Sequence, residues 1–77
     1  IKNKLTFKLE FELKNLPSKI KSIEEQIDLF NKKLSDPNFY KKDTDAFIEM
    51  TEKLELAKED LEYYETRWLE LEEKNRH

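Results

Sequence analysis

The stretch SDPNFYKKDTD, residues 35–45, divides the chain into two segments of similar length. Asp36 directly before Pro37 suits a helix end followed by a short turn, because proline lacks the N–H that continues a helix. Asp43 is a good N-cap for a second helix, and Asp45 complements its dipole. A connection this short makes two helices antiparallel neighbours. We therefore expect a helical hairpin that turns here.

Apolar residues on both sides of this stretch recur at alternating steps of three and four, the a/d spacing of a coiled coil. The first segment carries Leu9, Leu13, Leu16, Ile20, Ile23, Ile27, Phe30 and Leu34, and the second carries Phe47, Met50, Leu54, Ala57, Leu61, Tyr64, Trp68 and Leu71. Facing residues of an antiparallel hairpin have a constant sum of residue numbers. When the first position of one segment is paired with the last position of the other, and so on inward, every pair of residue numbers adds to 80 or 81.

The sequence therefore predicts an all-α fold, an antiparallel two-helix coiled-coil hairpin over residues 1–77. We expect helix 1 over about residues 6–34, a turn at 35–42 and helix 2 over about 43–75. Each helix would be about 45 Å long.

Pro17 interrupts this pattern, because it follows a seam residue and deprives the carbonyl of Leu13 of its partner. Upstream, Leu5, Leu9 and Leu13 are spaced by four and four, one residue more than a heptad. We expect a kink or π-bulge in residues 12–17 that absorbs the extra residue. The alternative is a helix break at Asn15 with a separate N-terminal helix.

Composition limits the classes of function that this chain can carry. Charged residues make up 43% of its 77 residues, and glycine and cysteine are absent, which is typical of long helices and excludes disulfides and thiol chemistry. No apolar run approaches the length of a membrane span. The only histidine is His77, and no set of residues has metal or catalytic spacing. We expect no enzyme activity, metal or cofactor. The chain starts at Ile1 rather than Met, so we expect a fragment of a larger protein.

Charge is unevenly distributed along the chain. Residues 1–42 carry ten lysines and six acids, whereas residues 43–77 carry five bases and twelve acids. Lysine contacts to phosphate suffice for non-specific nucleic-acid binding. The candidate contact residues are Lys4, Lys8, Lys14, Lys19, Lys21, Lys41 and Lys42. The acidity of helix 2 opposes such binding, and the charges also suit two solvated faces.

The aromatic residues allow more than one interpretation. Tyr63, Tyr64 and Trp68 could stack on nucleobases, but the last two lie on the seam and suit packing. Phe7 and Phe11 lie off the seam. They could cover the open end of the hairpin, or contact a preceding domain or a second chain.

Three motifs in order resemble those of one family. They are LTFKLEFELKNLPSKI at residues 5–20, LSDPNFY at 34–40 and YETRWLELE at 64–72. The chain resembles the C-terminal coiled-coil domain of Uup-type ABC-F ATPases over nearly its whole length. The family pattern of E-L-x-x-L-P-x-x-I, D-P-x-F-Y and Y-x-x-R-W-x-x-L matches residues 12–20, 36–40 and 64–71.

The resemblance implies a bacterial cytoplasmic protein whose two ATP-binding domains lie upstream, so ATP would bind there and not here. It implies a hairpin linked to DNA binding and to full function of the ATPase, with ribosome association as the wider theme. The family usually has polar residues at the positions of Leu9 and Phe11. The apolar pair here favours packing or self-association instead.

Three functions follow as hypotheses. The first is a non-catalytic module that binds DNA or RNA non-specifically through helix 1. The second is a protein-interaction or spacer hairpin that docks on the ATPase domains or the ribosome. The third is a homodimerisation element that uses Phe7 and Phe11.

Overall fold

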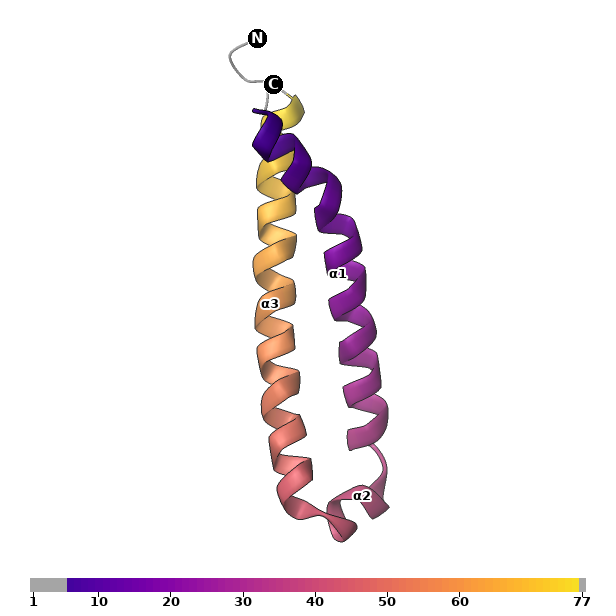
Figure 1. Ribbon diagram of the computed structural model, residues 1–77. Coiled ribbons are helices and arrows are strands. Elements are labelled where there is room, and N and C mark those ends of the chain that lie inside the picture. Colours follow the sequence, from indigo (N-terminus) through magenta and orange to yellow (C-terminus); the bar gives the residue numbers. More distant parts are fainter. Residues whose placement is uncertain (1–5, 77) are drawn as a thin grey trace.

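The computed structural model describes residues 6–76, and all its regular structure is helical. Its elements are α1 (Phe7–Leu34), α2 (Pro37–Lys42) and α3 (Thr44–Arg76), and no strand occurs within the described range. The prediction of an all-α fold is confirmed. Figure 1 shows α1 and α3 side by side in opposite directions, with α2 across one end and the start of α1 beside the end of α3 at the other. The molecule measures 59 × 16 × 15 Å.

The helix ends follow the capping residues of the sequence. Thr6 is the N-cap of α1, and its side chain accepts a hydrogen bond from the Leu9 N–H at 3.2 Å. At the far end Ser35 is the C-cap, and its N–H donates to the Asn31 carbonyl at 3.0 Å. Asp43 Oδ1 accepts from the Ala46 N–H at 3.0 Å, as expected of an N-cap.

The connection differs from the expected turn because residues 37–42 form the short helix α2. Asp36 caps this helix by accepting from the Asn38 N–H at 2.9 Å, and Pro37 occupies the first turn, where no N–H is needed. The ring of Phe47 in α3 lies 5.9 Å from Phe39 and 5.1 Å from Tyr40. This aromatic packing holds α2 against α3, which a simple turn would not achieve.

The core is a single seam between α1 and α3. All sixteen predicted seam positions are buried or half-buried, and Leu16, Ile23, Leu54, Ala57 and Leu71 are the buried ones. Around Leu16 and Leu71 pack four further seam residues, Leu9, Leu13, Tyr64 and Trp68. This apolar cluster therefore lies near the chain ends, beside the turn of α1 that contains Pro17.

Pro17 lies inside a continuous α-helix. Residues 7–34 contain no π turn and no break, so the predicted π-bulge is wrong, as is the alternative break at Asn15. On a regular helix a step of four places Leu13 about 40° from Leu9 around the helix axis. Both therefore stay on the seam side, and no bulge is needed to absorb the extra residue. Figure 1 shows the indigo end of α1 turning toward α3. That Pro17 kinks the helix here stays a prediction.

Candidate nucleic-acid interface

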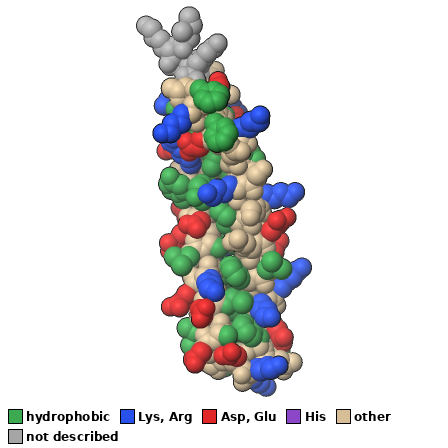
Figure 2. Space-filling view, in the orientation of Figure 1, with side chains coloured by type: hydrophobic (Ala, Val, Ile, Leu, Met, Phe, Trp, Pro, Cys, Tyr) green, Lys and Arg blue, Asp and Glu red, His purple; other side chains and the backbone are tan. Residues whose placement is uncertain are grey.

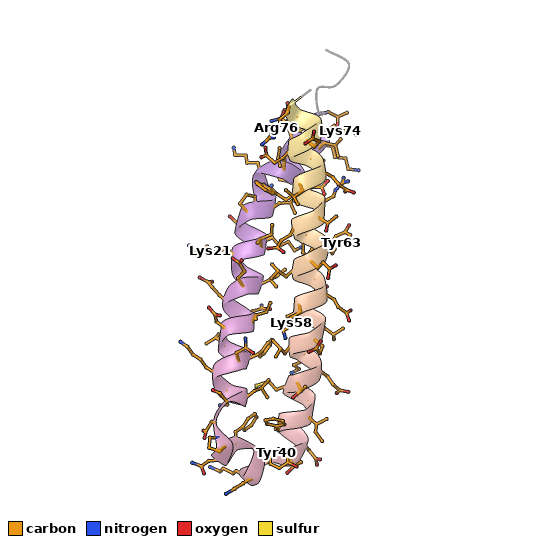
Figure 3. The ribbon with its side chains drawn as sticks, turned by 180° about the vertical axis from the view of Figure 1, so that it is seen from behind. Lys21, Tyr40, Lys58, Tyr63, Lys74 and Arg76 are labelled. Carbon is orange, nitrogen blue, oxygen red and sulfur yellow. The ribbon has the colours of Figure 1, made fainter. Side chains whose placement is uncertain are left out.

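The four predicted lysines of α1 that the structure describes are all exposed. Lys8 and Lys19 are eleven residues apart and lie within about 20° of one another around the helix. Lys14 and Lys21 form a second pair, about 140° away. Figure 3 shows Lys21 on the side of α1 that points away from α3. The lysines thus flank α1 on two sides and do not form one patch.

Lys8 and Lys19 border a groove of about 360 Å³ at the junction of α1 and α3. Its walls also include the exposed ring of Phe11 and the half-buried ring of Tyr64. The full lining is Lys8, Phe11, Glu12, Asn15, Leu16, Lys19 and Tyr64. The groove therefore combines two ammonium groups with an apolar surface.

The ammonium group of Lys19 is held in place by an aromatic face. Its Nζ lies 4.7 Å from the centre of the Tyr64 ring, within cation–π range. Tyr64 is oriented in turn by an edge-on contact with Tyr63 at 5.1 Å. Figure 3 shows Tyr63 on the outer side of α3. Both tyrosines therefore help to position a lysine of α1.

Glu12 carries the carboxylate among the groove's lining residues, and it pairs with Arg67 of α3. Arg67 Nε donates to Oε2 at 2.6 Å and Nη2 donates to Oε1 at 3.0 Å. This bidentate hydrogen bonding lowers the pKa of Glu12 from its ordinary value of 4.5, with smaller help from the charges of Arg67 and Lys8 against partial desolvation. The same bond raises the pKa of Arg67. Near neutral pH both members of the pair are therefore charged, and Arg67 also lies 3.7 Å from the carboxylate of Glu70 in its own helix.

The opposite side of α1 carries a second groove of about 290 Å³. It is lined by Pro17, Ile20, Glu65 and Trp68. Here the carboxylate of Glu65 is exposed and has no salt bridge among the described residues. This side is thus less favourable to a phosphate than the groove beside Lys8.

The remaining predicted lysines lie away from those of α1 or outside the described residues. Lys41 and Lys42 end α2 at the tip, and α1 runs fifteen residues, about 22 Å, from Lys19 to its own end. Lys33 adds to the tip, with its Nζ 5.7 Å from the centre of the Phe39 ring. Lys4 lies outside the described residues. The lysines of the tip are therefore separate from those of α1, and Asp36, Asp43 and Asp45 lie among them.

Sequence reasoning missed the pairing of Glu12 with Arg67. Both residues stand in the quoted motifs, and their numbers add to 79, next to the 80 or 81 of the seam pairs. Opposite charges at that register were a usable signal. It was overlooked because each residue also suits a solvated helix face.

The described residues include neither a metal-binding cluster nor a membrane-spanning helix. Between residues 6 and 76 no cluster of His, Cys, Asp and Glu side chains is arranged to hold a metal ion. Within the same range no helix combines the length and hydropathy of a membrane span.

Comparison with known families identifies the class of this chain. The family model described as ABC transporter C-terminal domain matches residues 4–73, so the chain belongs to that family. The resemblance to the C-terminal domain of ABC-F type proteins is thereby confirmed. The chain is an accessory module of an ABC protein. No curated protein and no solved structure matches it.

Proposed function

We propose that this chain is a non-catalytic, nucleic-acid-binding module of a bacterial, cytoplasmic Uup-type ABC-F ATPase, whose ATP sites lie in other domains. The observation that carries the proposal concerns the N-terminal half of α1. Lys8, Lys14, Lys19 and Lys21 are exposed there, and none has a carboxylate oxygen within 4.0 Å among the described residues. The nearby carboxylate of Glu12 is already neutralised by Arg67.

Binding by these lysines is electrostatic. Each lysine that reaches a phosphate releases condensed counterions, so affinity falls with salt in proportion to the number of contacts. Two contacts to a duplex, from the lysines of one flank of α1, give a slope of log affinity against log salt of about −1.8. The acidic helix α3 repels the phosphates, so the nucleic acid approaches the α1 side of the molecule.

We also propose that α1 bends at Pro17. Pro17 removes the hydrogen bond to the Leu13 carbonyl, and the first turns of α1 can then tilt onto α3. That tilt supports the contact of Glu12 with Arg67 and the placement of Lys8 beside the groove. A kinked hairpin, rather than a straight one, is therefore the form that presents these lysines.

Titration of labelled duplex DNA at about 50 and 200 mM salt tests the proposal, because phosphate contacts lose affinity steeply over that range. The variant carries Lys14→Glu, Lys19→Glu and Lys21→Glu. Its matched control carries Lys53→Glu, Lys58→Glu and Lys74→Glu on α3, an identical change in net charge. We expect the first variant to lose at least about tenfold in affinity and the control to lose far less.

Two results would contradict the proposal. One is a lack of binding by the unchanged chain at the lower salt concentration. The other is an equal loss in both triple variants, since that would reflect net charge and not a surface on α1. Circular dichroism checks that both variants remain helical.

A second function is favoured by a specific observation, the exposure of Phe7 and Phe11, whose side chains are 85% and 64% accessible. Figure 2 shows hydrophobic side chains beside Lys and Arg side chains at the end of the molecule near the chain termini. An apolar surface there suits docking on the ATPase domains or the ribosome, or pairing with a second copy. Such docking would respond to Phe7→Ala and be less sensitive to salt than phosphate binding.

A further inference from the structure

The groove beside Lys8 and Lys19 has a feature that a duplex backbone does not require. Phosphate contacts need only the ammonium groups. Yet the groove is also lined by the 64% exposed side chain of Phe11 and by the half-buried ring of Tyr64. An exposed aromatic ring between cations is the arrangement on which unpaired bases stack.

Phe11 is not explained by packing within this chain. The cluster around Leu16 and Leu71 recruits Leu9, Leu13, Tyr64 and Trp68, but not Phe11. On the helix Phe11 lies about 140° from Leu16, so it cannot turn into the seam. Its ring therefore has no role in the core of the hairpin.

We propose that this groove binds unpaired nucleotides of single-stranded nucleic acid, with a base stacked on Phe11 and neighbouring phosphates held by Lys8 and Lys19. The charges are complementary, since the two ammonium groups face phosphates and the groove's carboxylate, Glu12, is paired with Arg67. Lys19 contributes both its charge and its fixed position on the Tyr64 ring.

The size of the groove agrees with this occupant. Its volume of about 360 Å³ lies in the range of small-molecule sites, enough for one base and its sugar. Lys8 and Lys19 are separated by about 16 Å along the axis, so they would meet phosphates on the two sides of the stacked nucleotide that are more than one nucleotide apart. A duplex keeps its bases stacked inside and cannot offer one to Phe11.

This assignment rests on the proposed function, and the experiment separates the two. Fluorescence anisotropy measures binding of an oligothymidine of about 12 nucleotides, a typical single-strand site size. A duplex and an abasic oligonucleotide of the same length are measured in parallel. The variant is Phe11→Ala, and the matched control is Leu29→Ala, which lies on the same side of α1 and is equally exposed, 65% against 64%.

We expect Phe11→Ala to weaken oligothymidine binding about tenfold, because stacking of one base on an aromatic side chain contributes that much. Duplex binding should change less than about twofold, since its phosphates still meet the same lysines. Leu29→Ala should affect neither. The abasic strand should bind the unchanged chain as weakly as oligothymidine binds Phe11→Ala. Oligouridine should follow oligothymidine, because neither stacking nor ammonium contacts read the 2′-hydroxyl.

Three results would overturn the inference. If Phe11→Ala leaves oligothymidine binding unchanged while the duplex binds, the groove is not a base site but the proposed function stands. If Phe11→Ala weakens duplex and single strand equally, the ring does not act by stacking. If the unchanged chain binds neither, the proposed function fails and the groove assignment fails with it.

Discussion

At the scale of single residues, Glu12 and Arg67 form a bidentate salt bridge between the two long helices. A bidentate arginine–carboxylate pair fixes both distance and orientation, which apolar contacts along a seam do not. The pair also neutralises a carboxylate inside the groove that Lys8 and Lys19 border. It therefore links the stability of the hairpin to the charge of its candidate interface.

The pKa of Glu12 predicts how pH acts on this pair. Because folding lowers that pKa, the stabilisation is fully present above the ordinary value of 4.5 and is lost as pH falls through the lowered value. Glu12→Gln should therefore lower Tm at about pH 7, and its effect should shrink as the pH falls from 4.5 through the lowered pKa of Glu12. Thermal melts of both chains at a series of pH values from about 7 downward measure this difference in Tm. Glu25→Gln, at an exposed position of α1, is the control, and an equal effect of both changes would contradict the prediction.

Leu71 is the best-buried side chain, with 2% of its surface exposed. Leu71→Ala should lower the free energy of unfolding by about 2–4 kcal/mol, because it leaves a cavity beside Leu16. Leu69→Ala, at a neighbouring position with 60% exposure, should cost less than about 0.5 kcal/mol.

Urea denaturation measures both changes at Leu71 and Leu69. If Leu71→Ala unfolds the chain, Leu71→Met serves instead, with a cost below about 1.5 kcal/mol. Equal costs at positions 69 and 71 would mean that the seam does not run as the structure places it.

At the scale of the elements, α1 and α3 differ in regularity. Both bury one stripe, but only α1 contains a proline in its interior. A proline there costs about 3 kcal/mol in helix propensity, so a straight α1 would be more stable as an isolated helix. What the chain gains, in our interpretation, is the tilt that brings Glu12 to Arg67.

Pro17→Ala tests this interpretation. We expect the variant to gain helical signal, because an alanine at this position restores the hydrogen bond to the Leu13 carbonyl. We also expect the coupling between Glu12 and Arg67 to fall, because a straighter α1 moves away from α3. A double-mutant cycle of Glu12→Gln and Arg67→Gln, measured with and without Pro17, gives that coupling. Undiminished coupling in the Pro17→Ala background would show that the proline does not position Glu12. Ser18→Ala is the control, and it should leave the coupling unchanged.

At the scale of the whole molecule, the elongated shape limits where a function can lie. The radius of gyration of 17.3 Å far exceeds the value of about 11 Å expected for a globular domain of this length. An elongated hairpin exposes most of its surface and buries only one seam, so its functions must reside on surfaces and in shallow grooves. The groove at the α1–α3 junction is one such place.

Small-angle scattering tests the assembly of the chain. A monomer should give a radius of gyration near 17.3 Å, slightly increased by side chains and hydration, at every concentration. If Phe7 and Phe11 instead drive pairing, the scattering mass should rise with concentration and Phe7→Ala should abolish the rise. Sedimentation equilibrium is an independent check on the same mass.

Much of the fold was predictable from the sequence because the heptad pattern is a local property. Sixteen apolar positions at steps of three and four define a seam, and Asp36, Pro37 and Asp43 mark where one helix ends and another begins. These signals depend on helix periodicity and capping, which act within a few residues. The all-α fold and the family motifs could therefore be read without coordinates.

Only the tertiary structure decided which side chains meet. It showed that residues 37–42 form a helix packed on Phe47, that residues 12–17 contain no π-bulge, and that Glu12 pairs with Arg67. It also separated the lysines of α1 into two flanks and placed Lys19 over Tyr64. The physical reason is that such contacts depend on the rotation and tilt of two helices against one another. Hydrophobic spacing determines the face that each helix buries, but not the small angles that bring a carboxylate to a guanidinium or a lysine to a ring.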